Sequence, residues 1–269
     1  MGLLQRANVL HITLEMSDDM VLQRYFQSLF SIPKRPGEVK HTLFEFDELE
    51  RLSGFTEDVI KPTMDLQNKK IRKFLKEQTS EWGVRLDKLI VKQFPTRALT
   101  IQKLRGYLDN LETIEGFIPD ILLLDYAQLL YTDLGNYRLA TGRNYEDLRG
   151  IAVERNLALA TVHQANRLGA DAKELRDTQI AEDFSITATA DVVITHSRTE
   201  EEDRLGLARL YVSKARYDED RFTVLIAQAY GIGQFVLEST MMESLYWDRL
   251  GEAVGEIEGD SEEQIPDDN

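Results

Sequence analysis

The sequence predicts an α/β fold in which a mainly parallel sheet is flanked by helices. Seven apolar, β-branched runs recur along the 269 residues, and helical patterns separate several of them. Strands that alternate with helices are typical of βαβ units, whose strands run parallel. The last two runs follow each other across a short charged turn, which favours an antiparallel hairpin at the C-terminal end of the fold.

Each predicted strand is a short apolar run with polar or turn residues at its ends. In chain order the runs are NVLHITLE (8–15), KLIVKQF (88–94), DILLLDY (120–126), LALATVHQ (157–164), DVVITH (191–196), LARLYVSKAR (207–216) and FTVLIAQA (222–229). Helical patterns include SDDMVLQRYFQSLF (17–30) and NYEDLRGIAVERN (144–156). Ser17, Asp18 and Asp19 suit a helix start, because a hydroxyl can cap the helix and acids favour its first turn.

The chain is expected to divide at residue 237. Residues 1–237 would hold the α/β domain, within which 33–118 forms a long, charged, mostly helical excursion. Residues 238–269 carry eleven acids and one arginine, a net −10 of the chain's −15. This acidic tail is predicted to be solvated and partly disordered, with docking of the amphipathic piece around Trp247 as the alternative. Since the tail holds most of the negative charge, a local basic groove for nucleic acid is not excluded.

The composition argues against several kinds of site. The chain has no cysteine, and its four histidines lie too far apart for a local ligand pair, so no structural metal is expected. The N-terminus lacks a charged segment followed by an apolar run, and no run of about 18 apolar residues occurs anywhere. We therefore expect a cytoplasmic protein with no membrane role.

Three of the predicted strands end on a polar group: Glu15, Asp125 and Gln164. In an open parallel sheet, ligands bind beyond the carboxyl ends of the strands, so these groups could converge on one crevice. Any one of them alone could be an ordinary polar strand end. Together they supply what nucleotide hydrolysis needs: an acid to orient Mg²⁺, a carboxylate to activate water, and an amide near the γ-phosphate.

Five segments, in order, resemble the motifs of hexameric replicative DNA helicases of the DnaB type. They are VLHITLEMS, PDILLLDYAQLL, NLALATVHQANR, ITATADVVITHSR and LYVSKAR. The likeness runs from about Asn8 to Phe235 and is greatest to phage or plasmid members. It implies a RecA-like ATPase core that uses ATP and Mg²⁺, in the cytoplasm of a bacterial cell or a phage-infected host.

The resemblance assigns roles to individual residues. Glu15 would be the general base that polarises the attacking water, and Asp125 the Walker B aspartate that acts on Mg²⁺ largely through water. Gln128 would hold the coupling position and Gln164 would sense the γ-phosphate.

Two basic residues would act across the subunit boundary of a hexameric ring. Lys214 and Arg216 lie two apart, hence on one face of a strand, and would reach the neighbouring subunit's nucleotide as a sensor lysine and an arginine finger. The alternative is a surface salt-bridge pair on an edge strand.

The resemblance also implies a path for single-stranded DNA through the ring. Two segments that we expect to be loops, 132–143 and 167–178, would line the central pore. Their cations, which would track phosphates, are Arg138, Arg143, Arg167, Lys173 and Arg176, and Tyr137 could stack on a base. Primase or a helicase loader are further partners of such helicases.

No G-x-x-x-x-G-K-[ST] phosphate-binding loop occurs in the sequence. In the family this P-loop precedes the first matched segment, so the first strand of the core is expected to be missing too. The leading interpretation is the C-terminal part of a helicase that is active only with a P-loop-bearing partner or upstream segment, and is poorly stable without it. The alternatives are a non-catalytic ring or DNA-binding module, and another RecA-like ATPase of the recombinase or circadian-clock kind.

Overall fold

The computed structural model of the protein describes residues 7–81, 88–132, 135, 137–164 and 184–262. They belong to two units. Unit 1 comprises residues 1–26, 66–165 and 181–190, and unit 2 comprises 27–65, 166–180 and 191–269. This division differs from the expected one at residue 237, because residues 27–65 belong with the C-terminal strands.

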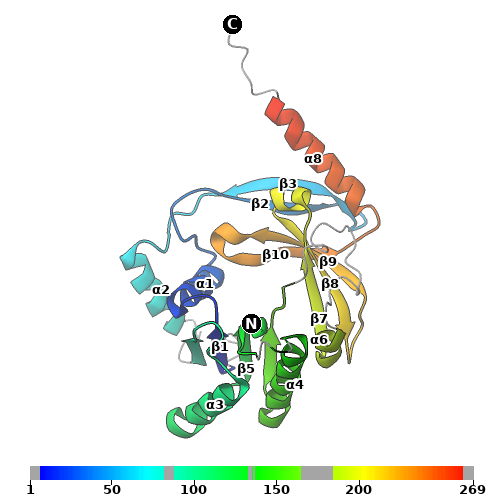
Figure 1. Cartoon of the computed structure of the whole chain (residues 1–269). Helices are drawn as coiled ribbons and strands as arrows, with labels where there is room; N and C mark the ends of the chain where they lie inside the picture. Colours follow the sequence, from blue (N-terminus) through cyan, green and yellow to red (C-terminus); the bar gives the residue numbers. More distant parts are fainter. Residues whose placement is uncertain (1–6, 82–87, 133–134, 136, 165–183, 263–269) are drawn as a thin grey trace. The chain divides into compact units, whose positions relative to one another are not determined.

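Unit 1 contains the predicted parallel sheet, with strand order β4-β1-β5-β6. Figure 1 labels its two inner strands, β1 and β5. The strands are β1 (Val9–Thr13), β4 (Leu89–Gln93), β5 (Ile121–Asp125) and β6 (Ala158–Thr161). Their registers bring the carboxyl ends together, with Thr13 opposite both Gln93 and Asp125, and Leu124 opposite Thr161. β1 lies inside the sheet with four of its five residues buried, which explains its continuous apolar run.

Helices accompany the sheet of unit 1. They are α1 (Asp18–Phe30, most of which is in unit 1), α2 (Lys69–Glu81), α3 (Ile101–Glu115), η2 (Ala127–Leu129), α4 (Tyr137–Arg155) and α6 (Phe184–Thr189). The limits of α3 follow from its sequence, because the Thr100 side chain accepts a hydrogen bond from the Lys103 N–H and Gly116 ends the helix at φ 64°. Leu104 and Leu108, one turn apart, are fully buried in the core against the sheet.

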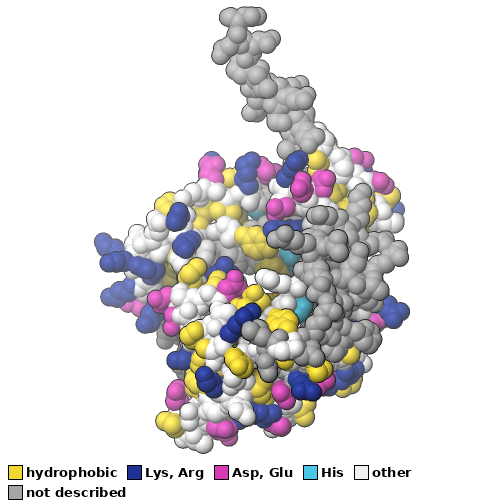
Figure 2. Space-filling view, viewed as in Figure 1, with side chains coloured by type: hydrophobic (Ala, Val, Ile, Leu, Met, Phe, Trp, Pro, Cys, Tyr) yellow, Lys and Arg dark blue, Asp and Glu magenta, His cyan; other side chains and the backbone are white. Residues whose placement is uncertain are grey.

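Helix α2 is amphipathic and strongly basic. Leu75 is buried, and the Asn68 side chain accepts a hydrogen bond from the Lys70 N–H at 2.9 Å, as a capping residue does. The exposed cations of this helix are Lys69, Lys70, Arg72, Lys73 and Lys76. Figure 2 shows dark blue side chains gathered at the left of the view, where Figure 1 places α2.

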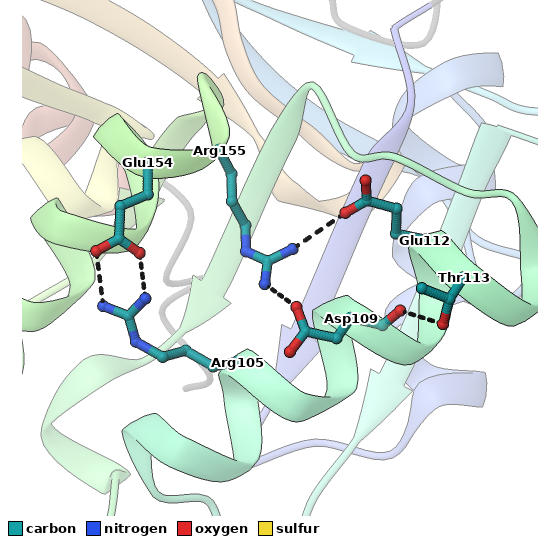
Figure 3. A network of polar contacts seen from close by, with 6 residues as sticks. All are labelled: Arg105, Asp109, Glu112, Thr113, Glu154 and Arg155. Atoms are coloured by element: carbon teal, nitrogen blue, oxygen red, sulfur yellow. Dashed lines mark hydrogen bonds and ion pairs between the residues drawn. The ribbon is translucent and has the colours of Figure 1, made fainter.

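Ion pairs join α3 to the C-terminal end of α4 (Figure 3). Arg105 pairs with Glu154, and Arg155 contacts both Asp109 and Glu112. Exposed pairs of this kind contribute only about 0–1 kcal/mol each, and Arg155 links the C-terminal end of α4 to two carboxylates of α3.

Unit 2 contains an antiparallel sheet in the order β10-β9-β8-β7 and the hairpin β2-β3. Its elements are β2 (Val39–Phe46), β3 (Leu52–Ile60), β7 (Val192–Ser197), α7 (Glu200–Arg204), β8 (Leu207–Ala215), β9 (Phe222–Ala229), η5 (Tyr230–Ile232), β10 (Gln234–Met241) and α8 (Tyr246–Glu262). The predicted C-terminal hairpin is confirmed as β8 and β9. The stretch 33–118, expected to be mostly helical, also holds the β2-β3 hairpin.

The first part of the acidic tail is folded. It begins inside β10 and continues as α8, whose Tyr246 and Leu250 are buried in the core of unit 2. The Tyr246 hydroxyl donates to Glu202 at 2.6 Å, and Glu202 also pairs with Arg209, whose guanidinium lies 4.8 Å from the Trp247 ring centroid. The aromatic residues of the tail therefore anchor α8 within unit 2.

The fold class predicted from the sequence is confirmed: a parallel sheet flanked by helices with an antiparallel C-terminal sheet. Within the described ranges, no helix has both the length and the apolar character needed to cross a membrane.

Candidate active site

The three polar strand ends follow adjacent strands of unit 1. Asp125 is the last residue of β5, Glu15 follows β1 by two residues, and Gln164 follows β6 by three. The Leu14 N–H donates to the Asp125 carbonyl at 2.8 Å, which ties the segment that carries Glu15 to the end of β5. The parallel registers thus bring these groups to one edge of the sheet, as the crevice argument requires.

Two threonines that the sequence reasoning missed hold the strand ends in shape. The Thr13 hydroxyl is fully buried and accepts the Met16 N–H at 3.0 Å, so the chain turns directly after β1 and leaves Glu15 exposed. The Thr161 hydroxyl donates to the Leu124 carbonyl at 2.8 Å and accepts the Ala127 N–H at 3.0 Å. Thr13 shapes the turn next to Glu15, and Thr161 links β6 to the backbone on either side of Asp125. The sequence alone does not indicate these contacts.

The two carboxylates create a common negative field. Burial, followed by the charges of Glu15 and Asp125, raises the pKa of Tyr126, so both carboxylates act on one phenol. Burial lowers the pKa of His11 in β1, and the Asp125 charge partly opposes this shift. The Asp125–Tyr126 peptide bond is cis.

This arrangement fits a magnesium nucleotide. Mg²⁺ is commonly held by one or two carboxylates together with substrate phosphates. Asp125 is a half-buried carboxylate at the end of β5, and Glu15 comes just after the neighbouring strand β1. Among the described residues no group of three or more His, Cys, Asp or Glu side chains could hold a metal. Phosphates and water molecules would therefore supply the remaining oxygen ligands.

Beside this pair lies a hydrogen-bonded row of four residues. The Gln164 N–H donates to Gln128 Oε1 at 2.9 Å, Gln128 Nε2 lies 3.2 Å from His163 Nε2, and His163 Nδ1 lies 3.0 Å from the Tyr145 hydroxyl. Gln128 and Gln164, each predicted separately as a site residue, are thus in contact. Sequence reasoning missed His163 and Tyr145, since the spacing of 18 residues between them gives no local signal.

The two basic residues predicted to act across a subunit boundary lie in unit 2. Lys214 is in β8 opposite Val193, and Arg216 comes just after the strand. The Arg216 guanidinium pairs with Asp191 at 2.8 Å, and about a third of its side chain is exposed. The register shifts between Val193 and Ile194, so β8 is irregular next to Lys214.

Of the basic residues predicted to contact DNA, two lie in helix α4 and three lie outside the described residues. The segment 132–143 is not a loop throughout, because α4 begins at Tyr137 and includes Arg138 and Arg143. Residues from Tyr137 onward include good helix formers and no proline, which allows the helix to start early. Tyr137 and Arg143 are exposed.

Three other predicted DNA contacts lie outside the described residues, namely Arg167, Lys173 and Arg176.

The parallel sheet, with acidic and amide groups at the ends of adjacent strands and an antiparallel sheet later in the chain, is the RecA-like fold that the sequence predicts. Solved structures share this fold. A solved ATPase domain matches with a TM-score of 0.59 at 17% identity, over 87% of this chain and 76% of that one. A solved DnaB-like replicative helicase, described with its interactions with primase, matches with a TM-score of 0.60 at 18% identity, over 87% of this chain and 53% of that one.

The chain is similar in sequence to a DnaB-like replicative helicase of Enterobacteria phage T4. They are 29% identical over 141 residues, which is 50% of this chain and 29% of the phage protein, so the match spans less than a third of that relative. No family model matches the sequence. The predicted resemblance to DnaB-type replicative helicases is confirmed by these similarities.

Proposed function

We propose that this chain forms part of the ATPase domain of a replicative DNA helicase, which couples ATP hydrolysis to movement along single-stranded DNA and to duplex unwinding. The observation that carries the proposal is the position of Glu15, Asp125 and Gln164 beyond the adjacent strands β1, β5 and β6 of a RecA-like sheet.

Each group has a chemical task that suits its surroundings. Glu15 is exposed and free to approach a water molecule, so it would orient that water and accept its proton. Asp125 is half-buried and would bind Mg²⁺ largely through water. Bound Mg²⁺ supplies charge neutralisation for the phosphates. Gln164, tied through its backbone to Gln128, would donate its side-chain amide toward the γ-phosphate.

The phosphate-cradling loop would come from polypeptide outside these 269 residues, either in the same chain or in a partner. In the described part of the chain, β6 pairs only with β5, so its second edge is open to another strand. None of the four residues of β6 is buried, and Val162, just after the strand, is 58% exposed. A strand carrying the P-loop would cover this edge.

The remaining parts of the proposal concern assembly and DNA. Lys214 and Arg216 would serve the nucleotide of the next subunit in a hexameric ring, which requires Arg216 to exchange Asp191 for phosphate. Arg138 and Arg143 on α4, with Arg167, Lys173 and Arg176, would track the phosphates of single-stranded DNA. Primase or a helicase loader are proposed partners, and the assembly would work in the cytoplasm of a bacterial cell or phage-infected host.

The test is unwinding of a forked duplex by the assembled protein with ATP and Mg²⁺. Wild type should unwind the fork, and Glu15→Gln should assemble and bind DNA without unwinding it. Unwinding by Glu15→Gln at the wild-type rate would refute the assigned base.

The missing P-loop motif favours one second candidate, a non-catalytic ring or DNA-binding module. It would assemble and bind DNA but give no nucleotide-dependent unwinding even when a P-loop-bearing polypeptide is supplied.

A further inference from the structure

We infer that Gln128, His163 and Tyr145 form a directional hydrogen-bond relay that ties the backbone of Gln164 to helix α4, and that His163 and Tyr145 are positioning residues for the nucleotide-sensing glutamines. The inference rests on the proposed function for its consequence in catalysis. The relay itself rests on three contacts of 2.9, 3.2 and 3.0 Å within unit 1.

The direction of the relay follows from one fixed donor. A backbone N–H can only donate, so the atom of Gln128 that faces the Gln164 N–H must be its amide oxygen. The amide nitrogen then faces His163, which obliges His163 Nε2 to accept. The proton of the neutral ring is therefore on Nδ1, from which it donates to the Tyr145 oxygen.

The same reasoning excludes the opposite tautomer of His163 with a turned Gln128 amide. If the His163 proton were on Nε2, Gln128 would have to turn its oxygen toward the ring and its NH₂ group toward the Gln164 N–H. Two donors would then face each other, and the link between the two glutamines would break. The tautomer of His163 and the orientation of the Gln128 amide are therefore coupled, because neither can change without the other.

Tyr145, the relay residue farthest from Gln164, connects the relay to helix α4. Tyr145 lies in α4 and is only 8% exposed, whereas Arg143, two residues earlier, is exposed. The C-terminal end of the same helix is held to α3 by the ion pairs of Arg155 (Figure 3). A displacement of Gln164 on nucleotide binding would therefore act first on the half of α4 that carries Tyr145 and Arg143, and not on the end that contacts α3.

The relay can be tested without catalysis, by ¹⁵N NMR of histidine-labelled protein, assigned with His163→Gln. We expect His163 in the Nδ1–H form in wild type. Tyr145→Phe removes the acceptor and should shift the ring toward the Nε2–H form, while Tyr107→Phe, which removes a hydroxyl on α3, should leave it unchanged. A wild-type ring in the Nε2–H form, or no response to Tyr145→Phe, would overturn the relay.

Its consequence is tested by ATPase assays on the assembled protein with and without single-stranded DNA. Tyr145→Phe should lower the ratio of stimulated to basal rate about fivefold, as expected for one lost hydrogen bond, while Tyr107→Phe keeps the wild-type ratio. An unchanged ratio in Tyr145→Phe would refute the coupling role. Absence of ATPase in wild type would instead refute the proposed function, and the NMR result would still decide the relay.

Discussion

Replacing Arg209 by methionine should destabilise unit 2 strongly. The Glu202 side chain is 0% exposed and that of Arg209 5%, and they meet in two contacts of 2.7 and 3.1 Å. Removing one partner leaves an uncompensated buried charge, which typically costs about 3–5 kcal/mol. Burial and the Glu202 charge raise the pKa of Tyr246, so its hydroxyl stays protonated and remains a donor, but one neutral donor cannot replace a guanidinium.

The matched control is Arg198→Met in the same unit. Arg198 pairs with Asp203 at 2.6 Å, but the two side chains are 39% and 57% exposed, so this pair should contribute only about 0–1 kcal/mol. Urea unfolding followed by Trp247 fluorescence, in a Trp82→Phe background that leaves one tryptophan, reports on unit 2. With a slope of about 1–3 kcal/mol per molar urea, Arg209→Met should lower the midpoint by about 1 M or more.

A second variant checks the physical reason. Glu202→Gln added to Arg209→Met removes the remaining buried charge, so the double variant should be more stable than Arg209→Met alone. If Arg209→Met and Arg198→Met lose the same small amount of stability, the argument from burial is wrong.

Three further predictions concern the site and the sheet. In a reconstituted assembly Glu15→Gln and Arg216→Ala should each abolish ATP hydrolysis, and mixing the two should restore part of it because one acts in cis and the other in trans; no rescue would count against the arginine finger. Arg143→Ala should weaken binding of single-stranded DNA and reduce the slope of log affinity against log salt concentration by about 1. Arg51→Ala in the β2-β3 hairpin should change neither the affinity nor the slope. An unchanged slope for Arg143→Ala, in titrations at several salt concentrations, would show that Arg143 does not contact DNA. The pKa of His11 in the folded state is lowered from 6.5, so the unfolded chain binds a proton at His11 more readily than the folded chain. Stability should therefore fall as pH drops below about 6.5. His11→Gln should flatten this part of a plot of urea midpoint against pH.

The strands of unit 1 could be predicted because each is a short, mainly apolar run, and β1 and β5 in the middle of the sheet hold its buried residues. A run such as that of β1 is apolar almost throughout, and its polar ends mark the edge of the sheet where a ligand binds. The β2-β3 hairpin could not be recognised in the same way. Its burial pattern is irregular, and charged residues such as Glu45, Glu57 and Asp58 make the segment resemble an exposed helix.

The candidate site was only partly predictable for a similar reason. Glu15, Asp125 and Gln164 each follow an apolar strand, so their positions are visible in the sequence. His163 follows a strand and Tyr145 lies in a helix, and they are in contact. No local sequence pattern predicts such a contact. Docking of the start of the tail was only the alternative expectation, because acidic residues there outnumber the aromatic ones that anchor it, Tyr246 and Trp247.

The most direct test of the central claim is ATP hydrolysis, measured with and without single-stranded DNA, by this chain alone and after co-expression with a P-loop-bearing polypeptide encoded upstream. The proposed function predicts hydrolysis in the co-expressed sample, stimulated by DNA and lost in Glu15→Gln. A folded co-expressed complex that hydrolyses no ATP would contradict it and favour the non-catalytic module.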